Sequence, residues 1–285
     1  MYNKKIAIIG VGFMGGSLAC ALKKKYPKLR ISGFARSEKS LKLLSKLAIV
    51  DEVSLEIKEV VLDSDIVALA LPVERIVEYF KVIKPYLKPG AIVFDLGSTK
   101  SEIEKKAKLI LPKTNYFVPC HPLAGSEKSG PRFSNPDLYK ESLCVITASR
   151  SKKATLEIKA LWESLGSRVI FMDSDRHDEI FCALSHFPHL LSFALTEFVP
   201  KEYAQYAPRS IRDLTRISNS PPRVWAEIFL ANKKNLKNNI REFKRIIALF
   251  EKNINNSDRE GLIRLLEQIN KKQSQIQTSD FKSAK

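Results

Sequence analysis

The sequence predicts a two-domain protein, with a parallel α/β sheet domain over residues 1–172 and an all-helical domain over residues 173–285. Three observations support this prediction. Short β-rich runs alternate with amphipathic helical stretches as far as residue 171, and a glycine-rich turn directly follows the first run. After residue 173 the apolar residues recur only with helical spacing.

The expected strands are short, apolar and rich in β-branched residues, as in a parallel sheet that helices cover on both faces. They comprise residues 5–9, 30–34, 66–71, 91–95, 116–118, 142–147 and 168–171. Helices are expected between them, for example over residues 15–25, 38–47, 73–86 and 99–111.

The second half reads as long helices. From residue 175 to 198 one apolar stripe recurs with a period near 3.6, through Ile180, Leu184, Phe187, Leu191 and Leu195. Further helices are expected over 223–250 and 258–275, with a frayed polar tail after them. Long apolar helical faces of this kind would suit packing against a second copy of the chain.

Composition excludes several classes of protein. The 48 basic and 31 acidic residues give a net charge of +17, but the lysines scatter along helices without interleaved aromatic residues. We therefore expect a solvated basic surface that attracts small anions, and no nucleic-acid binding. The apolar runs are too short to cross a membrane, and the N-terminus resembles no signal or transit segment, so a cytoplasmic protein is expected.

The four cysteines are widely spaced and form no C-x-x-C pair. This spacing does not suit a disulfide framework or a zinc site. Buried thiols in a reducing compartment are the better interpretation.

The turn after the first strand reads G-V-G-F-M-G-G at residues 10–16. A G-x-G-x-x-G between a strand and a helix is typical of a Rossmann-type dinucleotide-binding domain, because glycines allow the tight turn, the approach of a pyrophosphate and close helix packing. The alternative is a glycine-rich turn without a ligand. We predict that the cofactor contacts Gly10, Gly12, Phe13, Met14 and Gly15.

The end of the second strand indicates which cofactor is used. An NAD site usually has an acidic residue there, but this chain has Ala35, followed by Arg36 and Ser37. Arg36 could pair with a 2′-phosphate and Ser37 could donate a hydrogen bond to it. We therefore predict NADP over NAD, with NAD still usable; the alternative is that Arg36 is a plain surface residue.

Four motifs follow where this fold binds ligands, at carboxyl ends of strands and in the helical half. They read G-S-T-K at 97–100, C-H-P-L-A-G-S-E at 120–127, S-H-F-P-H at 185–189 and R-D-L-T-R-I at 212–217. Together they resemble the prephenate/arogenate dehydrogenase family, and the resemblance extends from Lys4 to about Asn235.

The resemblance implies an enzyme of tyrosine biosynthesis that oxidatively decarboxylates prephenate or arogenate with NAD(P)+. It places the substrate site on Ser98, His121, His186, His189 and Arg216. It further suggests that Glu127 and Asp213 join Arg216 in an ion network that gates the pocket, although Asp213 could equally neutralise Arg212.

The chemistry explains these residue types. Loss of hydride from the ring carbinol carbon releases the hydroxyl proton, and histidine is a natural acceptor near neutral pH. We assign this role to His121, with Ser98 bonded to the same hydroxyl and beside the nicotinamide. Arg216 offers a two-pronged contact to a carboxylate. His189 is the expected further substrate contact.

Other residues near these motifs have less definite roles. His186 either orients its neighbours or is an ordinary histidine on an apolar helix face, and Pro188 should disturb the helix locally. His177, in a polar run at a helix start, is expected on the surface. Trp225 is expected to be a core or dimer aromatic rather than a residue of the site. No third ligand stands near the paired histidines, so no metal is expected.

The resemblance leaves four points open. A homodimer is expected, and the choice between prephenate and arogenate is undecided. The chain offers no room for a fused regulatory domain, so tyrosine inhibition would act at the active site. The alternatives are a β-hydroxyacid dehydrogenase or related reductase, which usually has a catalytic lysine on the helical domain, and a non-catalytic NADPH-sensing protein.

Overall fold

The computed structural model describes residues 4–125, 128–147 and 149–278 of the 285-residue chain. The chain divides into two compact units, Met1–Asn235 and Leu236–Lys285. The first holds all the strands and the helices as far as α10 (Pro222–Ala231), and the second holds most of the last two helices.

A six-stranded parallel sheet forms the centre of the first unit, in the order β3-β2-β1-β4-β5-β6. Its strands are β1 (Lys5–Ile9), β2 (Arg30–Phe34), β3 (Glu52–Ser54), β4 (Ile66–Leu69), β5 (Ile92–Asp95) and β6 (Tyr116–Val118). The order reverses direction between β1 and β4, and ligands of such sheets bind in the crevice at this switch point. The predicted parallel sheet is therefore confirmed, with β3 as a strand that the sequence did not indicate.

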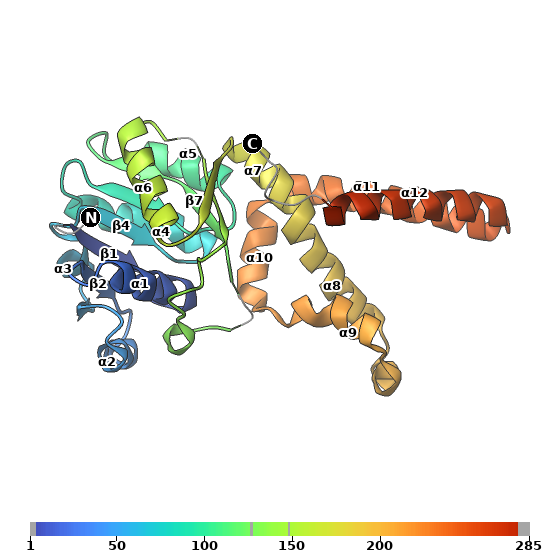
Figure 1. The fold of residues 1–285 in the computed structure, drawn as a ribbon, viewed down its shortest axis with the longest axis horizontal. Helices are drawn as coiled ribbons and strands as arrows, with labels where there is room; N and C mark the ends of the chain where they lie inside the picture. The colour runs from blue at the N-terminus through green and yellow to red at the C-terminus, as the bar shows by residue number, and fades with distance from the viewer. Residues whose placement is uncertain (1–3, 126–127, 148, 279–285) are drawn as a thin grey trace. The chain divides into compact units, whose positions relative to one another are not determined.

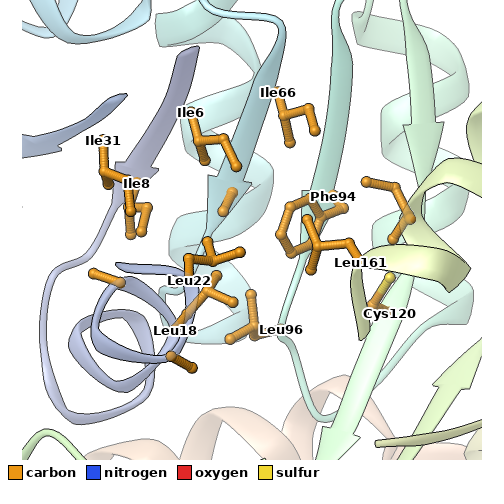
Figure 2. Close-up of a cluster of buried hydrophobic side chains, with 14 of the residues drawn as sticks. Ile6, Ile8, Leu18, Leu22, Ile31, Ile66, Phe94, Leu96, Cys120 and Leu161 are labelled. Carbon is orange, nitrogen blue, oxygen red and sulfur yellow. The ribbon is translucent and has the colours of Figure 1, made fainter. Parts of the chain in front are cut away.

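Helices cover both faces of this sheet. One cluster of buried side chains joins the sheet to α1 (Phe13–Lys25), α2 (Glu38–Leu47) and α6 (Lys152–Ser164). Figure 2 shows Leu18, Leu22 and Leu161 from these helices around Ile8 and Phe94 of the strands. A second cluster on the opposite face brings in α3 (Ile57–Val61), α4 (Val73–Ile83) and α5 (Ser101–Ile110).

The last three strands form a separate sheet, although we expected two of them, at 142–147 and 168–171, to extend the parallel sheet and did not expect the first of them. β7 (Cys120–Leu123), β8 (Leu143–Ile146) and β9 (Arg168–Phe171) form a separate sheet in which β7 runs antiparallel to β8. Pro119 separates β6 from β7 and has no N–H to donate, so the parallel pairing stops at Val118. His121 consequently lies within a strand rather than in a loop.

The predicted single helix over 175–198 is wrong in one respect: it is interrupted. α7 (Ser174–Phe181) passes through one π-helical turn (Cys182–His186) into α8 (Phe187–Phe198). The Phe187 N–H donates to the Cys182 carbonyl, five residues back. Pro188 offers no N–H to the carbonyl of Leu184, which is consistent with a break of the regular ladder here.

The rest of the helical part of the first unit consists of short elements (Figure 1). They are a 3-10 helix (Lys201–Tyr206), α9 (Arg209–Thr215), a second 3-10 helix (Arg216–Asn219) and α10. α9 and the 3-10 helix after it pack on α8, and α10 packs on α4 of the sheet domain. These contacts place the helices that carry the S-H-F-P-H and R-D-L-T-R-I motifs in the same unit as the sheet.

The second unit comprises α11 (Lys233–Asn255) from Leu236 onward and α12 (Arg259–Thr278). The stretch 223–250, expected as one helix, breaks at Asn232, where α10 ends. None of the described helices is both long and apolar enough to span a membrane. The four cysteines, all within the described residues, form no disulfide; three of them, Cys120, Cys144 and Cys182, are buried.

Two leucines on the covering helices offer a test of where the core lies. Leu161 is 1% exposed and Leu109 is 79% exposed. Leu161→Ala should lower the free energy of unfolding by about 2–5 kcal/mol, because it leaves a cavity in the packed core. Leu109→Ala, the control, should change it by less than about 0.5 kcal/mol. Urea unfolding followed by circular dichroism measures both, and equal losses would contradict this placement of the core.

Candidate active site

The glycine-rich turn lies between β1 and α1. Gly10 has φ of +94°, and a Cβ there would meet the Ala70 carbonyl oxygen at 2.2 Å. A Cβ at Gly15 would stand 2.3 Å from the Gly10 oxygen, so the helix packs closely on the turn. A Cβ at Gly12 would meet nothing within 4 Å. Space therefore lies open where Gly12 would let a ligand approach the backbone.

The N-terminus of α1 faces this turn with its first N–H groups uncapped. No side chain caps the helix, and no acidic residue stands in its first turn, which begins at Phe13. The Met14 carbonyl accepts a 2.7 Å hydrogen bond from the Tyr139 hydroxyl. Free N–H groups and the positive end of the helix dipole suit a phosphate, so this cradle fits a dinucleotide's pyrophosphate.

The segment after β2 is the candidate contact for the adenosine ribose. Ala35 is buried, whereas Arg36 and Ser37 are exposed. The Ser37 hydroxyl caps α2 by accepting the Ser40 N–H at 3.2 Å, and it also shares a 3.0 Å hydrogen bond with the Ser40 hydroxyl. No carboxylate follows β2 directly.

A buried ion pair, formed by Asp95 at the end of β5 and Lys100 just before α5, binds the backbone of β7. Lys100 and Asp95 are fully buried and bonded to each other. Both also bind the peptide of Cys120: its N–H donates to Asp95 at 3.1 Å, and its carbonyl accepts from Lys100 at 2.7 Å. Asp95 further accepts the Gly97 N–H at 2.9 Å. The pair therefore ties the loop that carries Ser98 to the strand that carries His121.

A chain of three side chains leads to His121. Asp178 lies 2.9 Å from His177 Nδ1, and His177 Nε2 lies 2.8 Å from His121 Nδ1. The Asp178 carboxylate also accepts the backbone N–H groups of Lys100 and Ser101 at the start of α5. The prediction that His177 lies on the surface is wrong: it is 0% exposed.

The carboxylate determines the direction of the hydrogen bonds in this chain. Ionised Asp178 only accepts, so His177 carries its proton on Nδ1 and presents a lone pair on Nε2. His121 must then donate from Nδ1 to His177. The Nε2 atom of His121 is left with its lone pair, which can accept a proton or a hydrogen bond.

The surroundings keep these imidazoles neutral. Burial lowers the pKa of His121 well below its usual value, and the charges on His177, Lys100 and His186 act in the same direction. Burial also lowers the pKa of His177, although its hydrogen bond to Asp178 opposes the shift. The pKa of Asp178 is lowered: burial opposes the shift but is outweighed by the hydrogen bonds from His177, Ser101 and Lys100.

The remaining two histidines follow the π-helical turn. His186 is 1% exposed, and burial lowers its pKa to about 4. His189 is half-buried, and its Nδ1 donates to the Ser185 carbonyl at 2.9 Å. Its ring stacks on Trp225 with centroids 3.5 Å apart. Trp225, expected in the core or a dimer contact, therefore lies beside a residue of the site.

The described contacts connect the charged residues of the predicted gate to the site less directly than the histidines. Arg216 is exposed, and its charge helps to lower the pKa of His189. Asp213 lies 3.6 Å from Arg209, one helical turn back, whereas Arg212 donates to the Ala207 carbonyl. Glu127 lies outside the described residues, and so does the gate that would include it.

Ser98 is half-buried in the loop after β5, and the structure brings this loop to the histidines. Sequence reasoning missed His177, Asp178 and Asn232, which are all buried polar residues. Asp178 does stand in the polar run that we assigned to a helix start. An acidic residue directly after a histidine was the one signal that could have identified it.

The arrangement combines a neutral imidazole acceptor with a nearby cradle for a dinucleotide. All four histidines of the chain belong to this one cluster: His177 and His186 add to burial in lowering the pKa of His121, and His189 adds to burial in lowering that of His186. No group of three or more side chains suited to a metal ion occurs in the part of the chain that the structure describes. The described groups therefore suit hydride and proton transfer to and from a small molecule.

Comparison with protein families matches two models. Residues 18–171 match the nucleotide-binding domain of prephenate dehydrogenase, and residues 173–268 match its dimerization domain. The first of these matches alone covers more than half of the chain.

Individual relatives agree with these matches. Prephenate dehydrogenase of Lactococcus lactis is 33% identical over 85% of this chain and 69% of its own length. Cyclohexadienyl dehydrogenase of Zymomonas mobilis is 33% identical over 80% and 81%. A crystal structure of prephenate dehydrogenase from Aquifex aeolicus, with hydroxyphenyl propionate and NAD+, has a TM-score of 0.87 at 32% identity, covering 96% of this chain and 98% of that one.

The depressed histidine pKa values make the folded state sensitive to acid. The unfolded chain takes up protons near pH 6.5 whereas folded His186 does so near 4, so the unfolded state binds more protons between these values. Stability is full above pH 6.5 and falls as the pH drops towards 4. His186 alone should account for about 2 kcal/mol between pH 7.5 and pH 5.

His186→Gln should remove that part of the pH dependence from urea unfolding measured at the two pH values. His189→Gln is the control, because His189 is only half-buried and should contribute less. An unchanged pH dependence in His186→Gln would contradict the prediction.

Proposed function

This chain belongs to the prephenate dehydrogenase family, and on that premise we propose that it converts prephenate to 4-hydroxyphenylpyruvate with NADP+ as the preferred hydride acceptor. Oxidative decarboxylation in tyrosine biosynthesis is the activity of this family. The observation that supports the proposal most directly is the chain Asp178–His177–His121, which leaves an acceptor nitrogen on His121.

The reaction needs one proton acceptor. A bound nicotinamide dinucleotide supplies the electron-poor ring that takes the hydride from the carbinol carbon of the substrate. His121 Nε2 takes the hydroxyl proton as the C–O bond becomes a carbonyl. The ring then loses its carboxylate as CO2, and the two electrons of the broken C–C bond complete the aromatic ring as a phenolate. The phenolate oxygen takes back the proton held by His121 and becomes the phenol.

A neutral histidine of low pKa is adequate for this step. Hydride loss makes the carbinol carbon electron-poor, so its O–H becomes strongly acidic and needs only a well-placed acceptor. The imidazolium that forms on His121 is stabilised through His177 by the ionised Asp178. Ser98, on the adjacent loop, is proposed to donate to the same hydroxyl.

Cofactor preference is proposed from the residues after β2. Ala35 provides no carboxylate to bind the ribose hydroxyls or to repel a 2′-phosphate, and exposed Arg36 provides a cation for that phosphate. The Aquifex aeolicus relative holds NAD+, so NAD+ is the alternative cofactor. Gly10, Gly12, Phe13, Met14 and Gly15 are proposed to surround the pyrophosphate.

Substrate preference is proposed from the charges around the histidines. Arg216 is proposed to bind a carboxylate, with His189 as a further substrate contact. Arogenate carries an ammonium group where prephenate has a keto group, and an ammonium favours a free carboxylate nearby. Asp178 already accepts from His177 and from the Lys100 and Ser101 N–H groups. Prephenate is therefore the proposed main substrate.

The oligomeric state of the chain is proposed from its match to a dimerization domain. Residues 173–268 match a dimerization domain, and exposed apolar side chains stand on the described helices within that range, among them Leu184, Phe198 and Leu230. We propose a homodimer, which light scattering would detect as twice 32.3 kDa.

Tyrosine contains a hydroxyphenyl propionate skeleton, the compound bound to the Aquifex aeolicus relative. It is proposed to compete with the substrate.

The test is an initial-rate assay that follows reduced nicotinamide with prephenate or arogenate, each with NADP+ or NAD+. Turnover fastest with prephenate and NADP+ is the expected result. Turnover fastest with arogenate, or with NAD+, would overturn the corresponding preference alone. No turnover in any combination, from folded protein that binds the cofactor, would overturn the proposed function.

Asp178→Asn tests the direction of the hydrogen-bond chain. An amide can donate to His177, which would reverse the chain and place a proton on His121 Nε2, so kcat should fall about 10²–10⁴-fold. His121→Asn should lose kcat to a similar degree with little change in KM. Asp175→Asn, an exposed carboxylate on the same helix, is the control and should keep its activity. Equal activity of the Asp178 and Asp175 variants would contradict this assignment.

Arg36→Ala tests cofactor preference. Loss of a charge-assisted contact to the 2′-phosphate should lower kcat/KM for NADP+ by about tenfold or more and leave NAD+ unaffected. Arg30→Ala, at the other end of β2, is the control. A ratio of the two kcat/KM values that stays as in the wild type would remove Arg36 from the cofactor site.

A further inference from the structure

Asn232 connects the end of α10 to the histidine cluster. It is 4% exposed, and its side-chain nitrogen donates to the Asp178 carbonyl oxygen at 2.7 Å. The same nitrogen lies 3.1 Å from Nδ1 of His186. Its side-chain oxygen accepts from the Asn235 amide at 2.9 Å. Every polar atom of the Asn232 side chain is therefore engaged.

The neighbours allow only one orientation of this amide. A backbone carbonyl oxygen cannot donate, so the NH2 group of Asn232 must face Asp178. The opposite orientation would set two acceptor oxygens against each other and leave the Asn235 donor facing another donor. The position of the nitrogen beside His186 therefore follows from chemistry and not from an arbitrary choice of amide orientation.

The amide in turn fixes the protonation of His186. One N–H of Asn232 goes to Asp178, and the other points at His186 Nδ1, which must accept it. A neutral ring that accepts at Nδ1 carries its proton on Nε2. The other three histidines carry theirs on Nδ1, because their partners are the Asp178 carboxylate, His177 Nε2 and the Ser185 carbonyl. His186 has the opposite tautomer.

The Nε2 atom of His186 is buried, and the His186 ring lies beside the loop that carries Ser98. The Ser98 carbonyl lies close enough to raise the pKa of His186, against the larger effect of burial. The geometry at Nε2 falls short of a hydrogen bond, and that atom has no other partner among the described residues. Hydrogen bonds in such sites are often long without ligands and shorten when the reactants bind.

We propose that Asn232 is a positioning residue: it holds His186 as a hydrogen-bond donor towards the Ser98 carbonyl and so aligns the Ser98 loop for the reaction. This rests on the proposed function for the role of Ser98, but the tautomer of His186 does not depend on it. The link runs from α10 through one imidazole to the loop after β5.

The first test reads the tautomers directly. Long-range 1H–15N NMR of the full chain, labelled with [15N]histidine and held at pH 7.5, separates protonated from unprotonated ring nitrogens. Four histidines give four ring patterns, which single His→Gln variants assign. The expected result is Nε2–H on His186 and Nδ1–H on His121, His177 and His189. Nδ1–H on His186 in the wild type would overturn the proposal.

The second test exchanges the donor for an acceptor. In Asn232→Asp a carboxylate faces Nδ1, so His186 should move its proton to Nδ1 or take up a second one. Because the Ser98 loop would lose its alignment, kcat should fall about tenfold to a hundredfold. Asn115→Asp is the matched control: Asn115 is buried and its amide also donates to backbone carbonyls, of Lys88 and Ala91, away from the site.

The control distinguishes positioning from general destabilisation. Both variants should lower the melting temperature, but only Asn232→Asp should change the His186 tautomer and kcat. If Asn232→Asp does not fold, Asn232→Ser, which leaves Nδ1 without the amide donor, should give a mixture of His186 tautomers. An unchanged tautomer, or a loss of kcat no greater than in Asn115→Asp, would overturn the proposal. Correct tautomers in a wild type without turnover would instead contradict the proposed function.

Discussion

The geometry of the candidate active site depends on the buried pair of Asp95 and Lys100. Taking both charges out of water is costly, and such a pair gives little net stability, but it constrains geometry strongly because each charge must keep its partners. Here the shared partner is the peptide of Cys120, held at its N–H and its carbonyl. The residue after that peptide is His121, and the loop between the two charges carries Ser98. One ion pair thus sets the separation of two proposed site residues, one in the loop after β5 and the other on β7 of the smaller sheet.

The same pair influences the electrostatics of the site. The ammonium of Lys100 adds to burial in disfavouring the imidazolium forms of His121 and His177. Asp178 acts in the opposite direction, and it reaches His121 only through His177. In the proposed mechanism, His121 is thus a neutral base at rest, and Asp178, two hydrogen bonds away, stabilises the proton once His121 has taken it up. A base exposed to water would not be held in a single tautomer in this way.

The sequence was sufficient to predict features that depend on residues close together in the chain. The turn at Gly10 needs a positive φ and close approach of the next strand, which glycine alone allows, so the cradle was recognisable from residues 10–16. The separate β7 sheet was not, because Cys120 is held by Asp95, 25 residues away. His177 looked like a surface residue for a similar reason: it stands among charged neighbours, and contacts distant in sequence, of α7 with α5 and of its ring with His121, accompany its burial. Asn232 belongs to none of the motifs or periodic patterns found in the sequence.

The π-helical turn before α8 has a geometric consequence of its own. Each residue of an α-helix advances by about 100° around the axis, so one extra residue in a turn rotates everything that follows by that amount. Without the bulge at Cys182–His186, the face of α8 that carries His189 would be turned by about a quarter of a circle relative to α7 and His177. The bulge thus changes the direction in which the side chains of α8 point relative to those of α7. A family member that lost one residue here would have to recruit a different side chain to stack on Trp225.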